Sequence, residues 1–561
     1  MNQRARWTIL PAVPDEYLNV SALPRVIAQL LYNRGVKPGE IEPFLAADER
    51  LEGNPFQLPD ISQAVSRVYR AVLSREKVGI YGDFDVDGVT AVVILAEGLS
   101  RLGAEVLLYI PDRFSEGHGL NTSAIETLHT QGASLIITCD CGITDINEVK
   151  RAQKLGIDVI VTDHHIPLER LPQAVAVVDP KRKDSAYPYP DLAGAGVAFK
   201  FVQALFHKDS REKWLARLLD LVALATVTDL SPMVGENRYL VKQGLIELNS
   251  SSRLGIQEMV KLAGLKPGRL GSEDISWVLG PRLNAAGRVN NASTSYQLLT
   301  TQSREEARLL ALELEGKNAE RQKLSSEVLG HAREKLAAKV HLPLLMEADE
   351  SYSIGVIGPV AGKLVDEFYK PVVIVSLDPE QCKASCRSIA EFDIMSALED
   401  CHDLLTAFGG HPLAAGFTVP RQNLAELEER LMSLAMDRLG HLDLRPELVV
   451  DAELPLSTFT GETFKLMQEL SPFGRGNPRP TFLSRQVEVI ECRNFGNQGG
   501  WLRLKLKQGN VIWQAVDFVS QRTGKEIPSC IDIVYSLEKS RWNGEEVLGL
   551  NLRDFVPSQT Q

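Results

Sequence analysis

The stretch "KVGIYGDFDVDGVTA", residues 77–91, poses the main structural question of this chain. An apolar run typical of a buried strand is followed by three aspartates spaced two residues apart, Asp83, Asp85 and Asp87. In an extended backbone alternate side chains point to one face, so the three carboxylates are expected to converge. Carboxylates that close repel one another and must take up protons or share a cation. The stretch therefore predicts a cation site at the end of a strand.

The composition is typical of a globular chain with several domains. Its 561 residues exceed one ordinary domain, and about three or four domains are expected. Apolar residues make up 44% of the chain, but no segment approaches the ~20 consecutive apolar residues that cross a membrane. The seven cysteines are scattered and odd in number, which argues against a disulfide framework and favours the cytoplasm.

The net charge of −12 argues at first against a nucleic-acid partner, because phosphates repel an acidic surface. The charge is unevenly distributed, however: residues 475–507 contain seven Lys or Arg and two Glu. A carboxylate-rich metal site also adds acidic residues that repel nothing once the metal is bound. Net charge therefore does not decide whether nucleic acid is a partner.

Strand and helix patterns alternate from about residue 77 to residue 229. The apolar runs "KVGIYGDFD", "AEVLLYIP", "ASLIITCDCG", "IDVIVTDHH" and "AVAVVDP" are typical of strands, and helical segments such as "GVTAVVILAEGLSRLG" separate them. Near-continuous apolar strands that alternate with helices indicate a parallel sheet covered on both faces. Ligands of such sheets bind beyond the carboxyl ends of the strands.

Polar side chains follow three of these strands. They are the three aspartates of the first stretch, then Asp140, and then Asp163, His164 and His165; Asp229 ends a later apolar helix. Oxygen ligands with one or two imidazoles suit Mn²⁺ or Mg²⁺, and the set is large enough for two ions about 3.5–4 Å apart. Taken singly, Asp87 or Asp140 could instead be a helix N-cap. Cys139 and Cys141 are interpreted as small packing residues.

Two later segments have clear patterns. Residues 301–339 predict one long helix that starts with a capping box, Ser303 and Glu306, and connects two domains; an ordinary surface helix is the alternative. The stretch "WLRLKLKQ", residues 501–508, alternates strictly, which predicts a half-buried strand. Its basic face is expected to contact nucleic acid through Arg503, Lys505 and Lys507, and the alternative is a solvated strand face.

Four motifs in order, "DFDVDG", "TCDCGIT", "TDHH" and "LATVTDLSP", resemble those of the DHH phosphoesterase superfamily. The segments "GVIGPVAGKLVDEFYKPVVIVS", "ASCRSI" and "FGGHPLAAGFTV" resemble the DHHA1 domain. "GPRLNAAGRVN" and "SPFGRGNPRPTF" resemble segments of the RecJ family of single-strand-specific DNA exonucleases, and the resemblance runs from roughly residue 56 to residue 556.

The resemblance implies an α/β fold in which a parallel-sheet DHH domain is joined by a long helix to a smaller α/β DHHA1 domain, followed by a C-terminal OB-like β-barrel. The implied domains are an N-terminal extension (1–55), the DHH domain (56–255), a linker with the long helix (256–340), the DHHA1 domain (341–440) and the barrel (446–556).

The resemblance also implies roles for individual residues. The metal ligands would be Asp83, Asp85, Asp87, Asp140, His164 and Asp229. Asp140 would bridge the two ions, with Asp85 and His164 on one and Asp87 and Asp229 on the other, and Asp83 would support the first. His165 and Arg282 would act on the scissile phosphate. Asn284 and Arg288, with Arg282, would steady the phosphates next to the cut. The 5′ end would be held by Arg113, Ser385, Arg387 and His411.

The implied function is 5′→3′ hydrolysis of single-stranded DNA with two divalent ions, Mn²⁺ or Mg²⁺, releasing 5′-mononucleotides in DNA repair or recombination. The alternatives are an oligoribonuclease or small-nucleotide phosphodiesterase of the same superfamily, and an inactive single-strand-binding scaffold. A single-strand-binding protein or a helicase is a candidate partner, and no membrane is expected. "ESYSI" (residues 350–354), Lys363 and Ala384 depart from the family pattern on the DHHA1 side, where they bear on end recognition.

Overall fold

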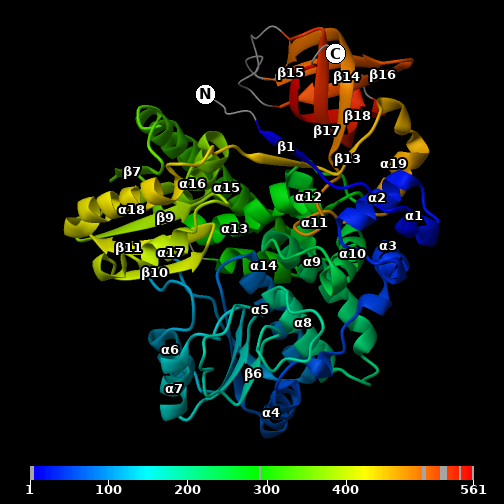
Figure 1. The fold of residues 1–561 in the computed structure, drawn as a ribbon. Coiled ribbons are helices and arrows are strands. Elements are labelled where there is room, and N and C mark those ends of the chain that lie inside the picture. The colour runs from blue at the N-terminus through cyan, green and yellow to red at the C-terminus, as the bar shows by residue number, and fades with distance from the viewer. Residues whose placement is uncertain (1–4, 290–291, 496–500, 519–526, 543–544, 559–561) are drawn as a thin grey trace. The chain divides into compact units, whose positions relative to one another are not determined.

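A computed structural model describes residues 5–289, 292–495, 501–518, 527–542 and 545–558 (Figure 1). The chain divides into two compact units. The larger unit comprises residues 7–111, 116–280 and 447–561, and the smaller unit comprises residues 1–6, 112–115 and 281–446. Each unit has its own sheets and core, and each is described separately.

The larger unit contains the predicted parallel sheet. Its strand order is β3-β2-β4-β5-β6, with every neighbouring pair parallel. The strands are β2 (Lys77–Gly82), β3 (Glu105–Tyr109), β4 (Ala133–Cys139), β5 (Asp158–Thr162) and β6 (Ala176–Val178). Ile80, Ile137 and Ile160 pair in register across the sheet and are fully buried. The prediction of a parallel sheet is confirmed.

Helices cover both faces of this sheet, as its apolar strands require. One face packs against α5 (Val86–Leu102) and α8 (Gly194–Leu205), and the opposite face against α6 (Thr122–Thr130) and α7 (Ile146–Lys154). Helix α9 (Leu219–Thr228) packs against α5 and α8. Helix α5 ends at Gly103, whose φ of 92° is the left-handed C-cap expected from the sequence. The helices α4 (Ile61–Ser74), α10 (Gly235–Asn249), α11 (Leu254–Leu262) and α12 (Ser272–Asp274) and the π-helical turn Ile275–Leu279 complete this part of the unit.

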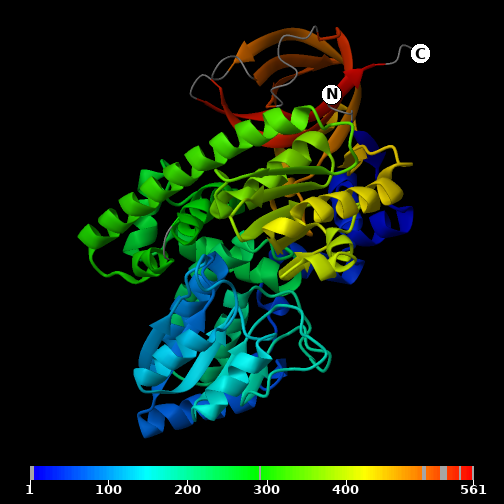
Figure 2. The same cartoon turned by 90° about the vertical axis from the view of Figure 1, so that its left-hand side faces the viewer.

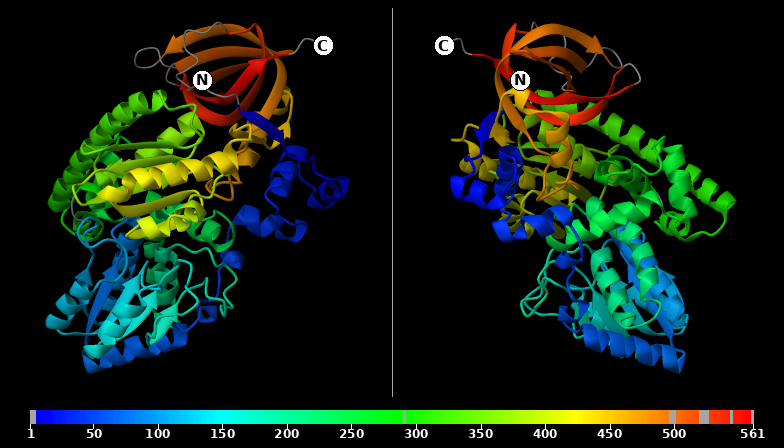
Figure 3. Two further views of the ribbon diagram at one scale, coloured as in Figure 1. Left: turned by 60° about the vertical axis from the view of Figure 1, so that its left-hand side comes forward. Right: turned by 90° about the vertical axis from the view of Figure 1, so that its right-hand side faces the viewer.

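Five described strands close a barrel at the C-terminal end of the larger unit (Figure 3). They are β14 (Phe482–Phe495), β15 (Trp501–Gln508), β16 (Val511–Asp517), β18 (Glu545–Pro557) and β17 (Cys530–Trp542), and β17 pairs back onto β14. The short strand β13 (Ala452–Glu453) pairs in parallel with the start of β14, and α19 (Gly461–Gln468) precedes the barrel. The predicted C-terminal β-barrel is confirmed.

The N-terminal segment packs against this barrel, which its sequence did not indicate. Strand β1 (Arg6–Ile9) pairs with β12 (Glu447–Val450). The helices α1 (Asp15–Ser21), α2 (Arg25–Asn33) and α3 (Ile41–Ala46) bury their apolar residues in the same core as the barrel strands. Leu30 and Leu31, for example, belong to one buried cluster with Leu504 and Leu506. The two ends of the chain therefore share one core.

A buried arginine ties this core to the helices around the parallel sheet. The guanidinium of Arg238, on α10, is fully buried and donates to the carbonyl of Phe44 at 2.7 Å and of Leu470 at 2.7 Å. It also donates to the carbonyls of Glu469 and Ser471. These carbonyls follow the last turn of α19, where unpaired C=O groups attract a cation. Burial lowers the pKa of Arg238 to about 10, so the group stays charged near neutral pH.

The smaller unit holds a mixed sheet with strand order β10-β11-β9-β8-β7. The strands are β7 (Leu345–Asp349), β8 (Val372–Ser376), β9 (Gln381–Arg387), β11 (Ala414–Pro420) and β10 (Ala407–His411). Helix α16 (Ile354–Phe368) covers one face, and α17 (Ile394–Glu399) and α18 (Leu424–Leu439) cover the other. This is the smaller α/β domain that the sequence predicts.

The predicted long helix is α15 (Arg304–Ala337), which follows α13 (Gly280–Val289) and α14 (Ser293–Thr300) (Figure 2). Its C-terminal part packs on the sheet through Val328, Ala332 and Leu336. Only half of the predicted capping box forms: Ser303 Oγ accepts from the backbone N–H of Glu306, but the N–H of Ser303 bonds to the Thr301 hydroxyl instead of the Glu306 carboxylate. Among the described helices, none has the length and hydropathy to span a membrane.

Candidate metal centre

The three aspartates after β2 converge by a different geometry from the one that the sequence suggests. Strand β2 ends at Gly82, and only Asp83 directly follows it. Asp85 is the N-cap of α5, with its carboxylate accepting from Gly88 N–H at 3.1 Å, and Asp87 lies in the first helical turn. The expectation of one extended face is therefore wrong. The carboxylates approach one another because a tight turn leads from the strand into the helix, as in other sites at the N-terminus of a helix.

The start of α8 lies close to both Asp87 and Asp140. Both oxygens of Asp87 accept N–H bonds from the start of α8, from Gly194 at 2.7 Å and Ala195 at 2.6 Å. Asp140 has a φ of 61°, a strained conformation for a residue with a side chain. A Cβ on Gly194 would lie 2.6 Å from the Asp140 Cβ, so only glycine fits beside it. The Asp87 carboxylate is therefore held in place by the chain itself, and Gly194 leaves the room that Asp140 needs.

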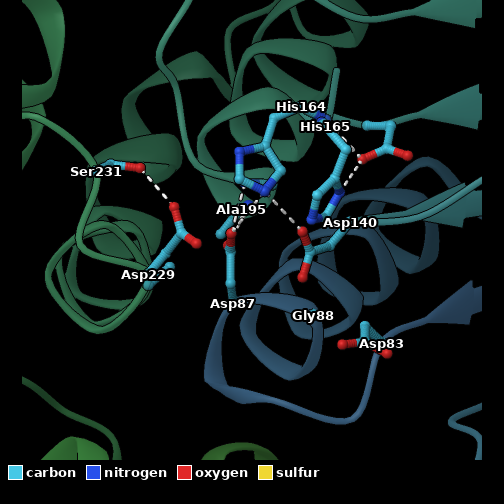
Figure 4. Close-up of polar contacts among 12 residues, drawn as sticks. Asp83, Asp87, Gly88, Asp140, His164, His165, Ala195, Asp229 and Ser231 are labelled. Atoms are coloured by element: carbon cyan, nitrogen blue, oxygen red, sulfur yellow. Dashed lines mark hydrogen bonds and ion pairs between the residues drawn. The ribbon is translucent and has the colours of Figure 1, made fainter. Parts of the chain in front are cut away.

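The two histidines after β5 have different environments (Figure 4). His164 is buried, and its Nε2 lies 3.0 Å from Asp140 Oδ1 and 3.7 Å from Asp87 Oδ2. The Nδ1 of His165 lies 2.8 Å from Asp163 Oδ1. Asp163 also accepts N–H bonds from Ile143 and His164, so its carboxylate orients the motif. The sequence grouped Asp163 with the polar strand ends but did not predict this orienting role.

Burial and mutual repulsion dominate the electrostatics of the cluster. Burial, followed by the charges of Asp229 and Asp85, raises the pKa of Asp87 well above its ordinary value. Burial, followed by the charge of Asp87, does the same for Asp140. Burial lowers the pKa of His164 to about 4, so its imidazole is neutral near pH 7 and can offer a lone pair. Two main effects act on the pKa of His165: burial lowers it, and the hydrogen bond and charge of Asp163 raise it. Together the two contributions of Asp163 outweigh burial, so the pKa of His165 lies above its ordinary value.

The residues fit divalent cations. Asp140 Oδ1 and His164 Nε2 are buried and face each other at 3.0 Å, yet neither makes a hydrogen bond of acceptable geometry in the described structure. Three groups of ligand atoms lie within 4.8 Å of one another: Asp83, Asp85 and Asp140; Asp87, His164 and Asp229; and Asp140, His164 and His165. A shared cation would satisfy these atoms, and carboxylates with imidazole suit Mn²⁺ or Mg²⁺.

The structure thus brings together all six residues predicted as ligands, with a different division. His164 groups with Asp140, as the sequence resemblance implies, but also with Asp87 and Asp229, and no group holds it with Asp85. Asp229, the C-cap of α9, accepts a hydrogen bond of 2.6 Å from the Ser231 hydroxyl. His165, predicted to act on phosphate, also lies within reach of the ligand set.

Sequence reasoning missed two groups near this cluster. His118 Nδ1 lies 3.1 Å from Asp83 Oδ1, and this hydrogen bond raises the pKa of His118 to about 9. His118 lies in a loop between Gly117 and Gly119, both of which have a positive φ. These two glycines are the feature of the sequence that could have indicated an unusual turn at His118. Asp179, at the end of β6, is fully buried, and burial raises its pKa to about 7.

The residues predicted to bind the 5′ end lie in the smaller unit. Arg387 and Ser385 share one face of β9, and the guanidinium donates to the Ser385 hydroxyl at 3.1 Å. Gly358 of α16 leaves room for both, because a Cβ there would lie 3.2 Å from Ser385 Oγ. No carboxylate pairs with Arg387 in the part of the chain that the structure describes, and burial lowers its pKa. His411 is exposed on β10 and pairs with Ala414 of β11, which in turn pairs with Arg387 of β9.

The "GPRLNAAGR" residues and Arg113 also belong to the smaller unit. Arg282, on α13, forms an ion pair with Glu315 of α15, with Nε 2.6 Å from Oε2. Arg288 donates to the Gly355 carbonyl at 3.3 Å, next to the start of α16. Asn284 and Arg113 are half-buried. A further arginine, Arg321 of α15, donates to Asn318 while its buried Nε lacks a hydrogen bond within the described structure.

The alternating strand β15 is confirmed, but its basic face is partly neutralised. Leu502, Leu504 and Leu506 are buried, as predicted. Lys507 Nζ lies 3.3 Å from Glu488 Oε2 on the paired strand. Lys505 faces Glu491 in register without an ion pair in the described structure, and Arg503 stacks on Phe495 with Cζ 4.7 Å from the ring centre. Trp501 joins the same aromatic cluster at 5.6 Å from Phe495.

Family models match three parts of the chain. The model of the DHH family, N-terminal domain, matches residues 77–226, which contain the carboxylate and histidine cluster up to His165. The DHHA1 domain matches residues 336–437, and the RecJ OB domain matches residues 450–554. The chain is therefore a DHH-family protein with a DHHA1 domain and a C-terminal OB domain.

Relatives that match most of this chain identify the family within the DHH proteins. The chain is 36% identical over 567 residues to the single-stranded-DNA-specific exonuclease RecJ of Bacillus subtilis, covering 100% of this chain and 72% of that protein. It is 32% identical to the RecJ of Haemophilus influenzae, covering 90% and 91% of the two chains. The structure of Thermus thermophilus RecJ in complex with Mn²⁺ matches with a TM-score of 0.84 at 28% identity, covering 100% of this chain and 81% of that one. The chain belongs to the RecJ family.

Proposed function

We propose that this protein is an exonuclease that hydrolyses the phosphodiester bonds of single-stranded DNA from the 5′ end and releases 5′-mononucleotides. The observation that carries the proposal is a buried cluster of carboxylates and one neutral imidazole, in which groups of three ligand atoms lie within 4.8 Å of one another. Asp140 Oδ1 and His164 Nε2 of this cluster have no hydrogen-bond partner in the described structure. Relatives that match 90% or more of this chain are named single-stranded-DNA-specific exonucleases.

Two divalent ions, Mn²⁺ or Mg²⁺, would supply hydroxide near neutral pH and neutralise phosphate charge. The proposed ligands are Asp83, Asp85, Asp87, Asp140, His164 and Asp229. Asp87 is held by the N-terminus of α8, so it needs no rearrangement to bind. His165, oriented by Asp163 and with a raised pKa, would donate a hydrogen bond to the scissile phosphate.

The arginines of the smaller unit would bind substrate phosphates, because their forked donors match phosphate oxygens. We assign the 5′ end to Arg387 with Ser385, His411 and Arg113, and the phosphates next to the cut to Arg282, Asn284 and Arg288. Arg387 suits this role best, because it is half-buried and has no carboxylate partner among the described residues. Lys505, Lys507 and Arg503 would contact the strand on the barrel.

The test is a degradation assay with 5′- and 3′-labelled single- and double-stranded DNA and RNA, with Mn²⁺, Mg²⁺ or a chelator. We expect labelled mononucleotide at once from 5′-labelled single strands, a shortening ladder from 3′-labelled ones, and no product from duplex or with chelator. Faster hydrolysis of short RNA would favour the oligoribonuclease alternative. Binding without hydrolysis under every metal condition would favour the inactive scaffold.

Three further proposals accompany this function. The protein would act in DNA repair or recombination on strands supplied by a helicase or covered by a single-strand-binding protein. It would work in the cytoplasm, a proposal supported by the seven cysteines, all of them free. The domain boundaries given above, with the DHH domain at 56–255 and the barrel at 446–556, also remain proposals, which limited proteolysis can test.

A further inference from the structure

A surface pocket of about 200 Å³ lies beside the metal centre in the larger unit. One wall comes from residues that flank Asp229, namely Val227, Leu230 and Ser231. Ser231 lines the pocket and also donates its hydroxyl to the Asp229 carboxylate at 2.6 Å. The pocket and the candidate metal centre therefore share a residue.

The opposite wall is the loop before the barrel, residues 473–479, and hydrogen bonds fix it to the first wall. The backbone N–H of Met233 donates to the Arg475 carbonyl at 2.6 Å, and the Ser272 hydroxyl donates to the Phe473 carbonyl at 2.8 Å. Arg479 pairs with Glu273 at 2.9 Å and stacks over Phe473. The pocket is thus pre-formed, with residues that flank Asp229 on one wall and the loop that leads into the barrel on another.

Two residues of the pocket, Trp277 and Arg475, are exposed. Trp277 is 78% exposed, which is unusual for the largest apolar side chain, and no aromatic ring packs on it in the described structure. It stands on the π-helical turn Ile275–Leu279, a geometry frequent at functional sites. Arg475 is exposed and has no ion pair among the described residues. An exposed aromatic face beside a free guanidinium is the combination that binds unpaired nucleotides.

We propose that this pocket binds one nucleobase of the single strand on the 3′ side of the cut, with the base stacked on Trp277 and an adjoining phosphate held by Arg475. This inference rests on the proposed function. The pocket volume lies below the roughly 300–1,000 Å³ of small-molecule sites, which suits a single base better than a whole ligand. The 3′ side follows because the pocket is lined both by neighbours of Asp229 and by the loop that leads into the barrel, which would bind the remaining strand.

The first test compares steady-state kinetics on a 30-nucleotide single strand. Trp277→Ala is expected to raise KM about tenfold, in line with the cost of removing one stacking platform, while kcat changes less than about twofold. Trp277→Phe should restore most of the affinity, which a merely structural role would not predict for so exposed a side chain. Arg475→Ala should raise KM and lower the salt dependence by about one counter-ion. Arg170→Ala, an exposed arginine elsewhere on the same unit, is the matched control.

The second test reads binding without turnover. In the full-length Asp140→Ala protein, a thymidine oligonucleotide should quench a tryptophan signal that disappears when Trp277→Phe is added. Unchanged KM in Trp277→Ala, with an active wild type, would overturn the inference, as would quenching that persists without Trp277. A pocket used by a protein partner would give this same unchanged KM. If the wild type cleaves no single strand, the proposed function fails, and the quenching titration still tests the pocket.

Discussion

The larger unit gathers carboxylates without enough donors, whereas the smaller unit holds arginines without enough carboxylates. Asp140 and His164 present buried atoms that lack hydrogen bonds, and burial raises the pKa of Asp140. Arg387 and Arg321 are half-buried with polar but uncharged partners, and burial lowers the pKa of both. Lys200 shows the contrast, because its buried ammonium lies 3.0 Å from the carboxylate of Glu236.

This difference indicates which parts of the chain need a bound ion or ligand of opposite charge. A buried carboxylate cluster is stable only with protons or cations, and a buried guanidinium favours an anion. Divalent ions would compensate the first cluster, and the phosphates of a nucleic acid would compensate the second. Charge that is already paired, as on the basic face of β15, should matter less for function.

The largest expected effect is that of removing the carboxylate common to two of the candidate ligand groups. Asp140→Ala should lower kcat by at least about 10³-fold, because ion positioning supplies several kcal/mol of transition-state stabilisation. Single-strand affinity measured by anisotropy should persist. Glu169→Ala, which removes an exposed carboxylate from the loop after β5, is the matched control and should keep normal activity. Near-normal hydrolysis by Asp140→Ala would show that this cluster is not the catalytic centre.

The next effect tests the arginine side of the comparison. Arg387→Ala should raise KM for 5′-phosphorylated single strands by about 10- to 100-fold, since a charged hydrogen bond is worth about 1.5–3 kcal/mol. Strands with a 5′-hydroxyl should lose less. Lys383→Ala is the matched control, because Lys383 lies on the same face of β9 and is exposed. Equal losses for the two kinds of strand would remove Arg387 from 5′-end recognition.

A third prediction concerns Asp179, a buried carboxylate outside the ligand set. Its pKa is raised to about 7 in the folded protein, against about 3.9 in the unfolded chain, so stability is lost as pH rises through that window. Asp179→Asn cannot ionise and can still accept the N–H of Lys181. With chelator present, the variant should gain about 1–2 kcal/mol over wild type between pH 5 and pH 8, a figure below the full linkage value because solvent relaxes around the charge. Parallel melting curves at the two pH values would contradict the assignment.

The smallest expected effect compares two lysines of β15, of which Lys507 forms an ion pair and Lys505 forms none in the described structure. Lys505→Ala should weaken single-strand binding about threefold, while Lys507→Ala should weaken it less, because Lys507 already pairs with Glu488. The two residues lie two positions apart on one face, so each serves as the control for the other. Salt titrations by anisotropy measure both. A larger loss for Lys507→Ala would mean that the ion pair opens to bind phosphate.

Local patterns predicted the fold well. Apolar runs bounded by turns located all five strands of the parallel sheet, and strict alternation predicted β15, since these signals depend on burial of neighbouring residues. The sequence also selected all the residues that form the carboxylate cluster. It could not give their geometry, because the turn that makes Asp85 an N-cap depends on the packing of α5 against β2.

Long-range contacts were out of reach of sequence reasoning. His118 meets Asp83 through a loop whose path no periodicity describes. Arg238 looked like an ordinary charged helix residue, yet it is buried among carbonyls more than 190 positions away along the chain. A single sequence holds no record of such pairs, which only the folded chain brings together.

The shared core at the two ends of the chain constrains the order of folding. Leu30 and Leu31 are buried against a barrel whose strands begin only at Phe482. At a synthesis rate of roughly 5–20 residues per second, the N-terminal helices wait tens of seconds for the residues that will cover them. These helices are thus synthesised long before the strands that bury them, and their apolar residues stay exposed to water in the interval.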